Sequence, residues 1–289
     1  PKGWYNRVNF NFNASGSHLA SRIGSIATKY QFSNFNLNVN AQTKSLVFVG
    51  FFTGFNPPRN DFYEPRVEGQ YLRRGSRVHG GLWLETNQAK KYSVYGEVFA
   101  ARFINFYNTR FFEAYLTQTY RFSSKFSISY QMSMEPVRDG IGYAGQLSSG
   151  KVIIGKRNIH TVSNVFNTKY NFNNKTGLTL RIRHYQSGVQ VKSFYALQSD
   201  GRLEPVNDYT ENADQNVNFF NVDMVYTWQF APGSFLNVVW KDAAFTSEDR
   251  LESKYFRNLN GILDTFHNNN LSLKVIYFLD YLQLKKVRK

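Results

Sequence analysis

VNFFNVDMVYTWQFAPGSFLNVVWKDAAF, from Val217 to Phe245, reads as two strands joined by a tight turn. In the first arm, apolar side chains recur at every second position from Phe220 to Phe230, and mostly polar residues lie between them. This period of two is that of a β-strand. The segment Ala-Pro-Gly at 231–233 breaks the pattern as a turn does, and the second arm resumes it. The stretch therefore predicts a long antiparallel hairpin with one apolar face and one mostly polar face.

The composition suits a sheet with two such faces. Aromatic residues make up 17% of the 289 residues, yet the mean hydropathy is -0.46. The longest apolar run, Leu46 to Phe52, is much shorter than the roughly 18 to 20 residues of a membrane helix. The chain has no cysteine, which excludes disulfides and thiolate metal sites.

The net charge of +15 raises the question of an anionic partner. Lysine and arginine are scattered singly through strands and loops and form neither a stripe nor a basic helix. We therefore predict no nucleic-acid partner.

Alternating segments recur along the whole chain, at intervals of about ten to fifteen residues, which is typical of a membrane barrel. We predict an all-β fold, a transmembrane antiparallel up-and-down β-barrel. The thirteen expected strands cover residues 4–13, 17–28, 32–42, 45–54, 77–87, 91–103, 109–122, 125–136, 158–172, 177–188, 217–230, 234–246 and 270–281.

Short and long connections alternate between these strands. Short turns are expected at 14–16, 43–44, 88–90, 123–124, 173–176 and 231–233. The long connections are 55–76, 136–157, 189–216 and 246–269, and the last includes a short helix or lid at 251–266. Short turns at one rim and long loops at the other are typical of outer-membrane barrels. We predict a location in the cell outer membrane, with the short turns periplasmic and the long loops extracellular.

An odd strand count has a consequence for the chain as a whole. Bacterial single-chain barrels have even strand numbers. We therefore expect at least one strand upstream of Pro1, fourteen or more in total, and a first strand that runs inward like the last. Residues 1–289 would then form a single outer-membrane barrel domain, the C-terminal part of a longer chain.

Aromatic residues gather near the short turns on the apolar side of several strands. An outer-membrane barrel carries such rings in a girdle at each membrane interface. The predicted girdle consists of Tyr120, Phe122, Tyr170, Phe172, Tyr226, Trp228, Phe230 and Tyr281. The alternative is a soluble barrel with its apolar face inside, which would have to hold many large rings in a small interior.

The opposite face of the strands carries charges of both signs. If lipid lies outside, these side chains point into the lumen: the candidates are Glu97, Glu113, Arg181, Arg183, Asp223 and Lys241. Charges in a protein-walled interior pair with one another or line water. Two roles stay open, structural ladders that set a field across the lumen and contacts with a solute or plug.

No constellation for catalysis stands out. The five histidines are scattered, and HExxH, GxSxG and glycine-rich phosphate motifs are absent. His160 and Ser163 belong to opposite faces of one strand. The loop acids Asp208, Glu211 and Asp214 fit a solvated loop better than a calcium site. We predict no enzyme activity, no metal site and no cofactor.

Two segments resemble a known family: FNVDMVYTWQFAPGSFLNVVWKDAAFTSE at 220–248 and NLSLKVIYFLDYLQLKK at 270–286. They are similar to the C-terminal barrel of the Gram-negative outer-membrane family known as domain-of-unknown-function family 5916. Further similarity lies at 55–74, at 169–185 and near Ile153. Members usually carry a family-9-type carbohydrate-binding domain ahead of the barrel, which implies a link to glycans. The family has no established catalytic residues to carry over.

These observations predict a non-enzymatic outer-membrane barrel protein, either a channel or transport protein or a subunit of a surface assembly. One alternative is a structural scaffold in a larger envelope or secretion complex. Another is an outer-membrane hydrolase. The expected partners are outer-membrane lipid or lipopolysaccharide, proteins of an envelope complex, and a glycan.

Overall fold

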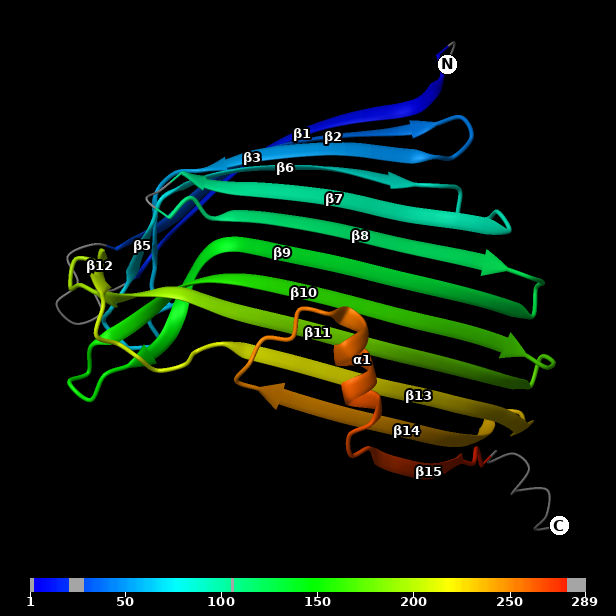
Figure 1. Cartoon of the computed structure of the whole chain (residues 1–289). Coiled ribbons are helices and arrows are strands. Elements are labelled where there is room, and N and C mark those ends of the chain that lie inside the picture. The colour runs from blue at the N-terminus through cyan, green and yellow to red at the C-terminus, as the bar shows by residue number, and fades with distance from the viewer. Residues whose placement is uncertain (1–2, 21–28, 105–106, 280–289) are drawn as a thin grey trace.

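A computed structural model describes residues 3–20, 29–104 and 107–279, most of which form one broad antiparallel sheet (Figure 1). The strands of the main path alternate in direction along the chain. Its elements are β1 (Tyr5–His18), β2 (Tyr30–Thr43), β3 (Phe48–Asn56), β4 (Arg59–Asp61), β5 (Leu72–Arg74), β6 (Ser76–Glu85), β7 (Tyr92–Ile104), β8 (Arg110–Arg121), β9 (Phe126–Gln146), β10 (Val152–Asn171), β11 (Thr176–Leu197), β12 (Leu203–Val206), β13 (Gln215–Ala231), β14 (Ser234–Glu248), α1 (Tyr255–Leu263) and β15 (Asn268–Ile276).

The main sheet has thirteen strands and an up-and-down topology. Twelve of them follow one path, β1-β2-β3-β6-β7-β8-β9-β10-β11-β13-β14-β15, and β12 pairs with β11 beside it. Strands β4 and β5 form a separate small sheet. The predicted antiparallel up-and-down sheet is confirmed. Within the described residues β1 and β15 are edges that each pair on one side, and the sheet is not closed.

The two ends of the sheet differ in their connections, as the alternation predicts. One end, the turn rim, carries the short connections 44–47, 86–91, 122–125, 172–175 and 232–233. The other end, the loop rim, carries the described connections 57–75, 147–151, 198–214 and 249–267. The helix expected within 251–266 is present as α1. All the long connections therefore lie at one rim.

The predicted turn at 14–16 is wrong. Ala14 pairs with Phe35 and Gly16 with Ser33, so β1 continues to His18 as one strand. Most of the strand expected at 17–28 falls on residues 21–28, which are outside the described residues. Tyr5 lies opposite Thr43 at the turn rim, so β1 runs toward the loop rim and the predicted direction of the first strand is also wrong. The strand expected upstream of Pro1 stays a prediction.

The expected long loop at 136–157 is also wrong. Strand β9 continues to Gln146, β10 begins at Val152, and only five residues join them. Pro136, Gly140 and Gly142 resemble loop residues in the sequence, but here they lie in or beside irregular pairing, with register shifts between β9 and β10. Bulges of this kind accommodate glycine and proline within a strand.

The extended ends of β9, β10 and β11 gather with β5 and β12 at the loop rim, and we call this part the cap (Figure 1). Its centre is a small cluster of buried side chains: Leu72, Val152, Ile154 and Leu197. Partly buried Val67, Ile141, Tyr143 and Leu203 pack against the cluster. The cap thus has a hydrophobic core of its own.

A charged cluster fastens the β4–β5 segment to β9. Arg74 donates from Nε to Asp61 Oδ2 (2.7 Å) and from Nη2 to Glu64 Oε2 (2.8 Å). Glu64 Oε1 in turn accepts a hydrogen bond from the backbone N–H of Tyr143 (2.7 Å). Burial alone would raise the pKa of Asp61, but the charge and hydrogen bond of Arg74 outweigh it, so this pKa lies below its usual range.

The lowered pKa of Asp61 predicts acid sensitivity of the cap. Stability from a depressed carboxyl pKa is present above its unfolded value of about 3.9 and is lost as the pH falls through the folded value. We expect proteolysis of the cap to accelerate below about pH 4, and Asp61→Asn to weaken the cap at neutral pH and flatten this dependence. Asp200→Asn is the control, because its pair with Arg202 is exposed and worth little. An unchanged pH profile in Asp61→Asn would contradict the role of the pair.

The two faces of the main sheet differ in chemistry. The apolar face carries, in register across six strands, Val39, Phe51, Leu82, Val98, Ala114 and Met134. The polar face carries, also in register, Trp83, Glu97, Tyr115, Ser133, Ser163 and Tyr185. Large side chains of the apolar face are exposed, for example Leu82 at 58% and Leu271 at 74%. An exposed apolar surface of this extent marks a contact with membrane or protein.

The polar face is the more crowded of the two. On it Trp83, Tyr95 and Phe99 are half-buried, whereas Leu82, Leu84 and Val98 of the apolar face are exposed. Side chains converge on the inner side of a curved sheet and diverge on its outer side. The crowding therefore indicates that the polar face is the inner one.

Candidate functional site on the polar face

The structure places all six charged residues that the sequence selected on the polar face. Arg181 lies opposite Asp223, which lies opposite Lys241. Arg183 is two residues along from Arg181 on β11, opposite Asn221 on β13. On the same face but farther along the sheet, between β7 and β8, Glu97 is opposite Tyr115 and Glu113 is opposite Phe99.

The charges on the middle of this face are separated by sign. Glu97, Glu113 and Glu135 lie on β7, β8 and β9, whereas Arg181, Arg183 and Lys241 lie on β11 and β14. Asp223 is an acidic residue within the cationic group, because it lies in the same row as Arg181 and Lys241. Such an arrangement sets up an electric field across the face, from the cationic strands to the acidic ones.

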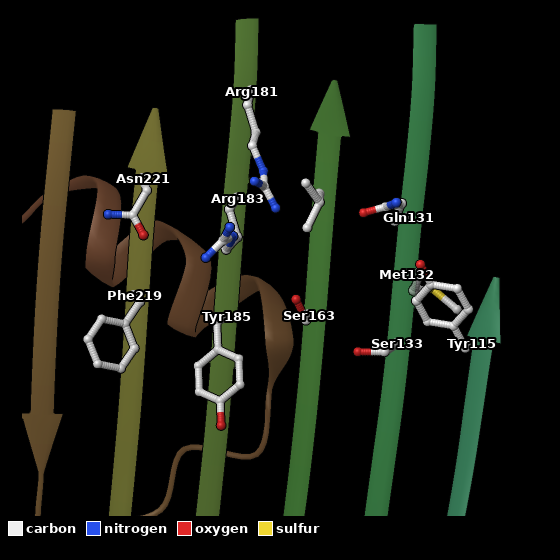
Figure 2. Close-up of a pocket in the computed structure, with 11 residues that line it drawn as sticks. Tyr115, Gln131, Met132, Ser133, Ser163, Arg181, Arg183, Tyr185, Phe219 and Asn221 are labelled. Atoms are coloured by element: carbon white, nitrogen blue, oxygen red, sulfur yellow. The ribbon is translucent and has the colours of Figure 1, made fainter. Parts of the chain in front are cut away.

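A depression of about 580 Å³ lies between the two groups, over β8 to β13. Figure 2 shows Arg181 and Arg183 on β11 near the rings of Tyr185 and Phe219, with α1 behind the sheet. Further lining comes from Tyr115, Gln131, Ser133, Ser163 and Asn221. Ser163 lies directly opposite Ser133 and Tyr185, so neighbouring strands bring hydroxyls and rings together.

The two arginines give the depression its chemistry. Among the described residues, no carboxylate lies within ion-pair distance of either guanidinium. A guanidinium presents donors that fit a carboxylate or phosphate with two parallel hydrogen bonds. With its rings and hydroxyls, the depression could bind a polar solute that carries an anionic group.

The predicted aromatic girdle forms a nearly continuous chain of ring contacts at the turn rim. Centroid distances between successive rings are 6.5 Å for Tyr92–Tyr120, 4.6 Å for Tyr120–Phe122, 4.8 Å for Phe122–Phe126, 5.8 Å for Phe126–Tyr170, 4.8 Å for Tyr170–Phe172 and 6.4 Å for Phe172–Tyr226. Trp228, Phe230 and Tyr277 form a second group, at 5.9 and 6.3 Å. Tyr281 lies outside the described residues. The sequence missed Tyr92, Phe126 and Tyr277, although their position beside the short turns is the same signal.

The histidines and the loop acids are not brought together. His184 lies on the apolar face under α1, where its Nδ1 is 2.9 Å from the Tyr255 hydroxyl. Asp214 Oδ1 accepts a hydrogen bond from the backbone N–H of Val191 (2.7 Å), which ties the acidic loop to β11. In the part of the chain that the structure describes, no three His, Asp or Glu residues form a group that could hold a metal ion.

A family model described as a domain of unknown function, DUF5916, matches residues 1–288. The chain belongs to the DUF5916 family. The match confirms the resemblance found in the 220–248 and 270–286 segments. No curated protein matches the DUF5916 chain.

Two solved structures are similar to the DUF5916 chain in outline. A NanC porin structure is 11% identical, with 94% of this chain and 99% of that chain covered and a TM-score of 0.29. The Pseudomonas putida toluene transporter TodX is 9% identical, with 85% and 78% covered and a TM-score of 0.30. Likenesses this distant carry no argument about function. Among the described residues, no helix has both the length and the apolar composition to cross a membrane.

The sequence predicted the charged residues on the polar face of the DUF5916 chain. It did not predict the uncharged residues that line the depression. Tyr115, Ser133, Ser163 and Tyr185 share one row across four strands. Alternation within each strand places them on the polar face, but their meeting depends on the register between strands. Register is set by pairing over the whole sheet, which one strand's sequence does not encode.

Proposed function

We propose that the DUF5916 chain forms the wall of an outer-membrane β-barrel protein of the channel type, without enzymatic activity. Its apolar face would meet lipid and its polar face a water-filled lumen. The observation that carries the proposal is the division of one sheet into an exposed apolar face, edged by aromatic rings at the turn rim, and a crowded charged face. This is the pattern of a transmembrane barrel.

The dimensions of the strands support this proposal. A strand needs about 9 to 11 residues to cross the hydrocarbon core at the usual tilt. Strand β8 has 12 residues, β7 has 13 and β14 has 15. In water, each exposed Å² of the apolar face would cost about 25 cal/mol relative to burial. The soluble-barrel alternative needs the apolar face inside, whereas here it is the less crowded face.

The orientation is part of the proposal. Outer-membrane barrels have short periplasmic turns and longer extracellular loops. The turn rim would then lie in the periplasm, and the loop rim and the cap would lie at the cell surface.

We propose further that the depression around Arg181 and Arg183 favours anions. Each guanidinium about 10 Å from a passing ion contributes about 0.4 kcal/mol in water, or roughly twofold in preference. Each arginine thus favours an anion and disfavours a cation by about twofold, so changing both to alanine should lower the anion-to-cation permeability ratio by up to about sixteenfold. The measurement is the reversal potential of the purified protein in planar bilayers under a salt gradient. Arg202→Ala, an exposed cation in the cap, is the control.

Two results would count against this proposal. A protein that inserts but does not conduct would remove the channel function, and an unchanged permeability ratio in the double variant would remove the role of the arginines. A glycan acid tests the solute class: galacturonate should reduce the current through the unaltered protein more than galactose does. This difference should disappear in the double variant.

A further inference from the structure

The segment 251–267, which we call the strap, contains α1 and crosses the apolar face, on the side of the sheet opposite the depression (Figures 1 and 2). It contacts β10, β11, β13 and β14 near the loop rim. Leu251 packs so closely over Gly188 that a Cβ at that glycine would lie 2.4 Å from the Leu251 side chain. The first residue of the strap is therefore in close contact with the wall.

The wall beneath the strap is polar, unlike the rest of the apolar face. The residues concerned are Asn164, His184, Gln186, Asn216, Asn218 and Asp242, and all but the half-buried Asn164 are buried. Polar groups on the lipid side of a barrel wall would be costly if they faced hydrocarbon. This patch needs a cover if the apolar face lies in a membrane.

The strap supplies that cover with its own polar side chains. Asn258 Oδ1 accepts hydrogen bonds from Asn216 Nδ2 (2.7 Å) and Asn218 Nδ2 (3.1 Å). The Tyr255 hydroxyl accepts one from Asn164 Nδ2 (2.9 Å) and lies 2.9 Å from His184 Nδ1.

The end of the strap is held in the same way. Asp242 Oδ2 lies 2.7 Å from His267 Nδ1, and the other ring nitrogen of His267 is 3.2 Å from the carbonyl oxygen of Ile262. This single histidine links the last turn of α1 to β14.

The outward side of the strap exposes large apolar side chains among polar ones such as Asn260 and Asp264. Phe256 is 74% exposed, Leu263 is 45% exposed and Phe266 is 85% exposed. Beside them the exposed side chains include the cations Lys254 and Arg257. The amide of Asn258 thus faces the wall while Phe256, Leu263 and Phe266 face away from it, as expected of a segment held between a polar wall and a membrane interface.

The height of the strap on the wall identifies that medium. On β11, Leu178, Leu180 and Ile182 form the apolar stretch next to the turn rim, and His184 and Gln186 follow as the ninth and eleventh residues of the strand. A crossing takes about 9 to 11 residues. The strap therefore begins where the hydrocarbon of the bilayer ends, and its last residue, His267 beside Asp242, is level with Ile182.

We propose that the strap is an interfacial membrane anchor that seals the polar patch of the wall and inserts Phe256, Leu263 and Phe266 into the lipid at the outer edge of the hydrocarbon. Lys254 and Arg257 then lie at the level of the anionic headgroup phosphates. Amphipathic helices bind membrane interfaces in this manner. The inference rests on the proposed membrane location, and its test must separate the two.

Because the chain has no cysteine, single-cysteine variants can each carry one nitroxide label. We would label Phe256→Cys on the strap, Leu180→Cys on the apolar face and Phe219→Cys at the depression, in phosphatidylcholine–phosphatidylglycerol vesicles. Power saturation then measures collisions with oxygen, which concentrates in lipid, and with a water-soluble nickel complex. We expect oxygen to dominate at positions 180 and 256, with position 256 at the shallower depth, and nickel to dominate at 219.

The outcomes separate the two proposals. Nickel access at position 256 with oxygen access at 180 would overturn the anchor and leave the barrel intact. A label at 256 that is immobile and shielded from both reagents would also overturn it, because a protein would then cover the strap. Nickel access at 180 would remove the membrane location and the anchor with it.

Discussion

Leu116→Arg is expected to prevent the chain from assembling in a membrane, whereas Thr117→Arg, one residue along β8, is expected to be tolerated. Leu116 lies on the apolar face, opposite Gly96 and Met132. An arginine on the lipid side near the middle of a barrel wall costs about 2 to 4 kcal/mol. Thr117 lies on the polar face, opposite Gln131, where the proposed lumen would hydrate a new cation.

The two variants differ only in the face that receives the charge, which makes them a matched pair. Folding into vesicles can be followed by urea titration and by protection from protease. We expect the Leu116→Arg titration to shift by the stated free energy, or no protected species to form, while Thr117→Arg stays close to the unaltered protein. Equal sensitivity at both positions would contradict the assignment of the faces.

The stability of the cap should depend on Leu72, by a free energy similar to that expected for Leu116→Arg. Leu72 is 1% exposed and belongs to the buried cluster with Val152, Ile154 and Leu197. Replacing a buried leucine by alanine costs about 2 to 5 kcal/mol through lost burial and a residual cavity. Because the cap has its own core, we expect Leu72→Ala to loosen the cap and leave the wall folded.

Hydrogen exchange measures this separation directly. Amides of β12 and of the cap ends of β10 and β11 should exchange faster in Leu72→Ala, while amides of β7 and β8 stay protected. Leu46→Ala, in an exposed turn at the other rim, is the control and should change neither region. Faster exchange throughout β7 and β8 would show that the cap and the wall unfold together.

The alternation of apolar and polar residues predicted most of the fold, because the two faces of a barrel wall meet different solvents. Between Phe220 and Phe230, the period of two fixes both the strand and its apolar side, and the structure has β13 there. The same signal placed Arg183 and Asp223 on one face. These properties are local to one strand and are therefore visible in its sequence.

Features that depend on pairing between strands were not visible. The small residues Ala14 to Gly16 have turn chemistry, but pairing with β2 keeps them extended. Pro136 and Gly140 suggest a loop, but irregular pairing with β10 absorbs them. The strap was expected as a short helix or lid, while its seat on the apolar face depends on two amides of β13, Asn216 and Asn218, meeting Asn258.

The central claim is that one face of this sheet meets lipid and the other meets water. The most direct test is a series of ten single-cysteine variants along β8, from position 111 to position 120, in reconstituted vesicles, each treated with a membrane-impermeant maleimide. The account predicts a period of two, with fast labelling at odd positions such as Phe111 and Thr117 and slow labelling at even positions such as Leu116. Uniform labelling along the strand, or fast labelling at the even positions, would contradict it.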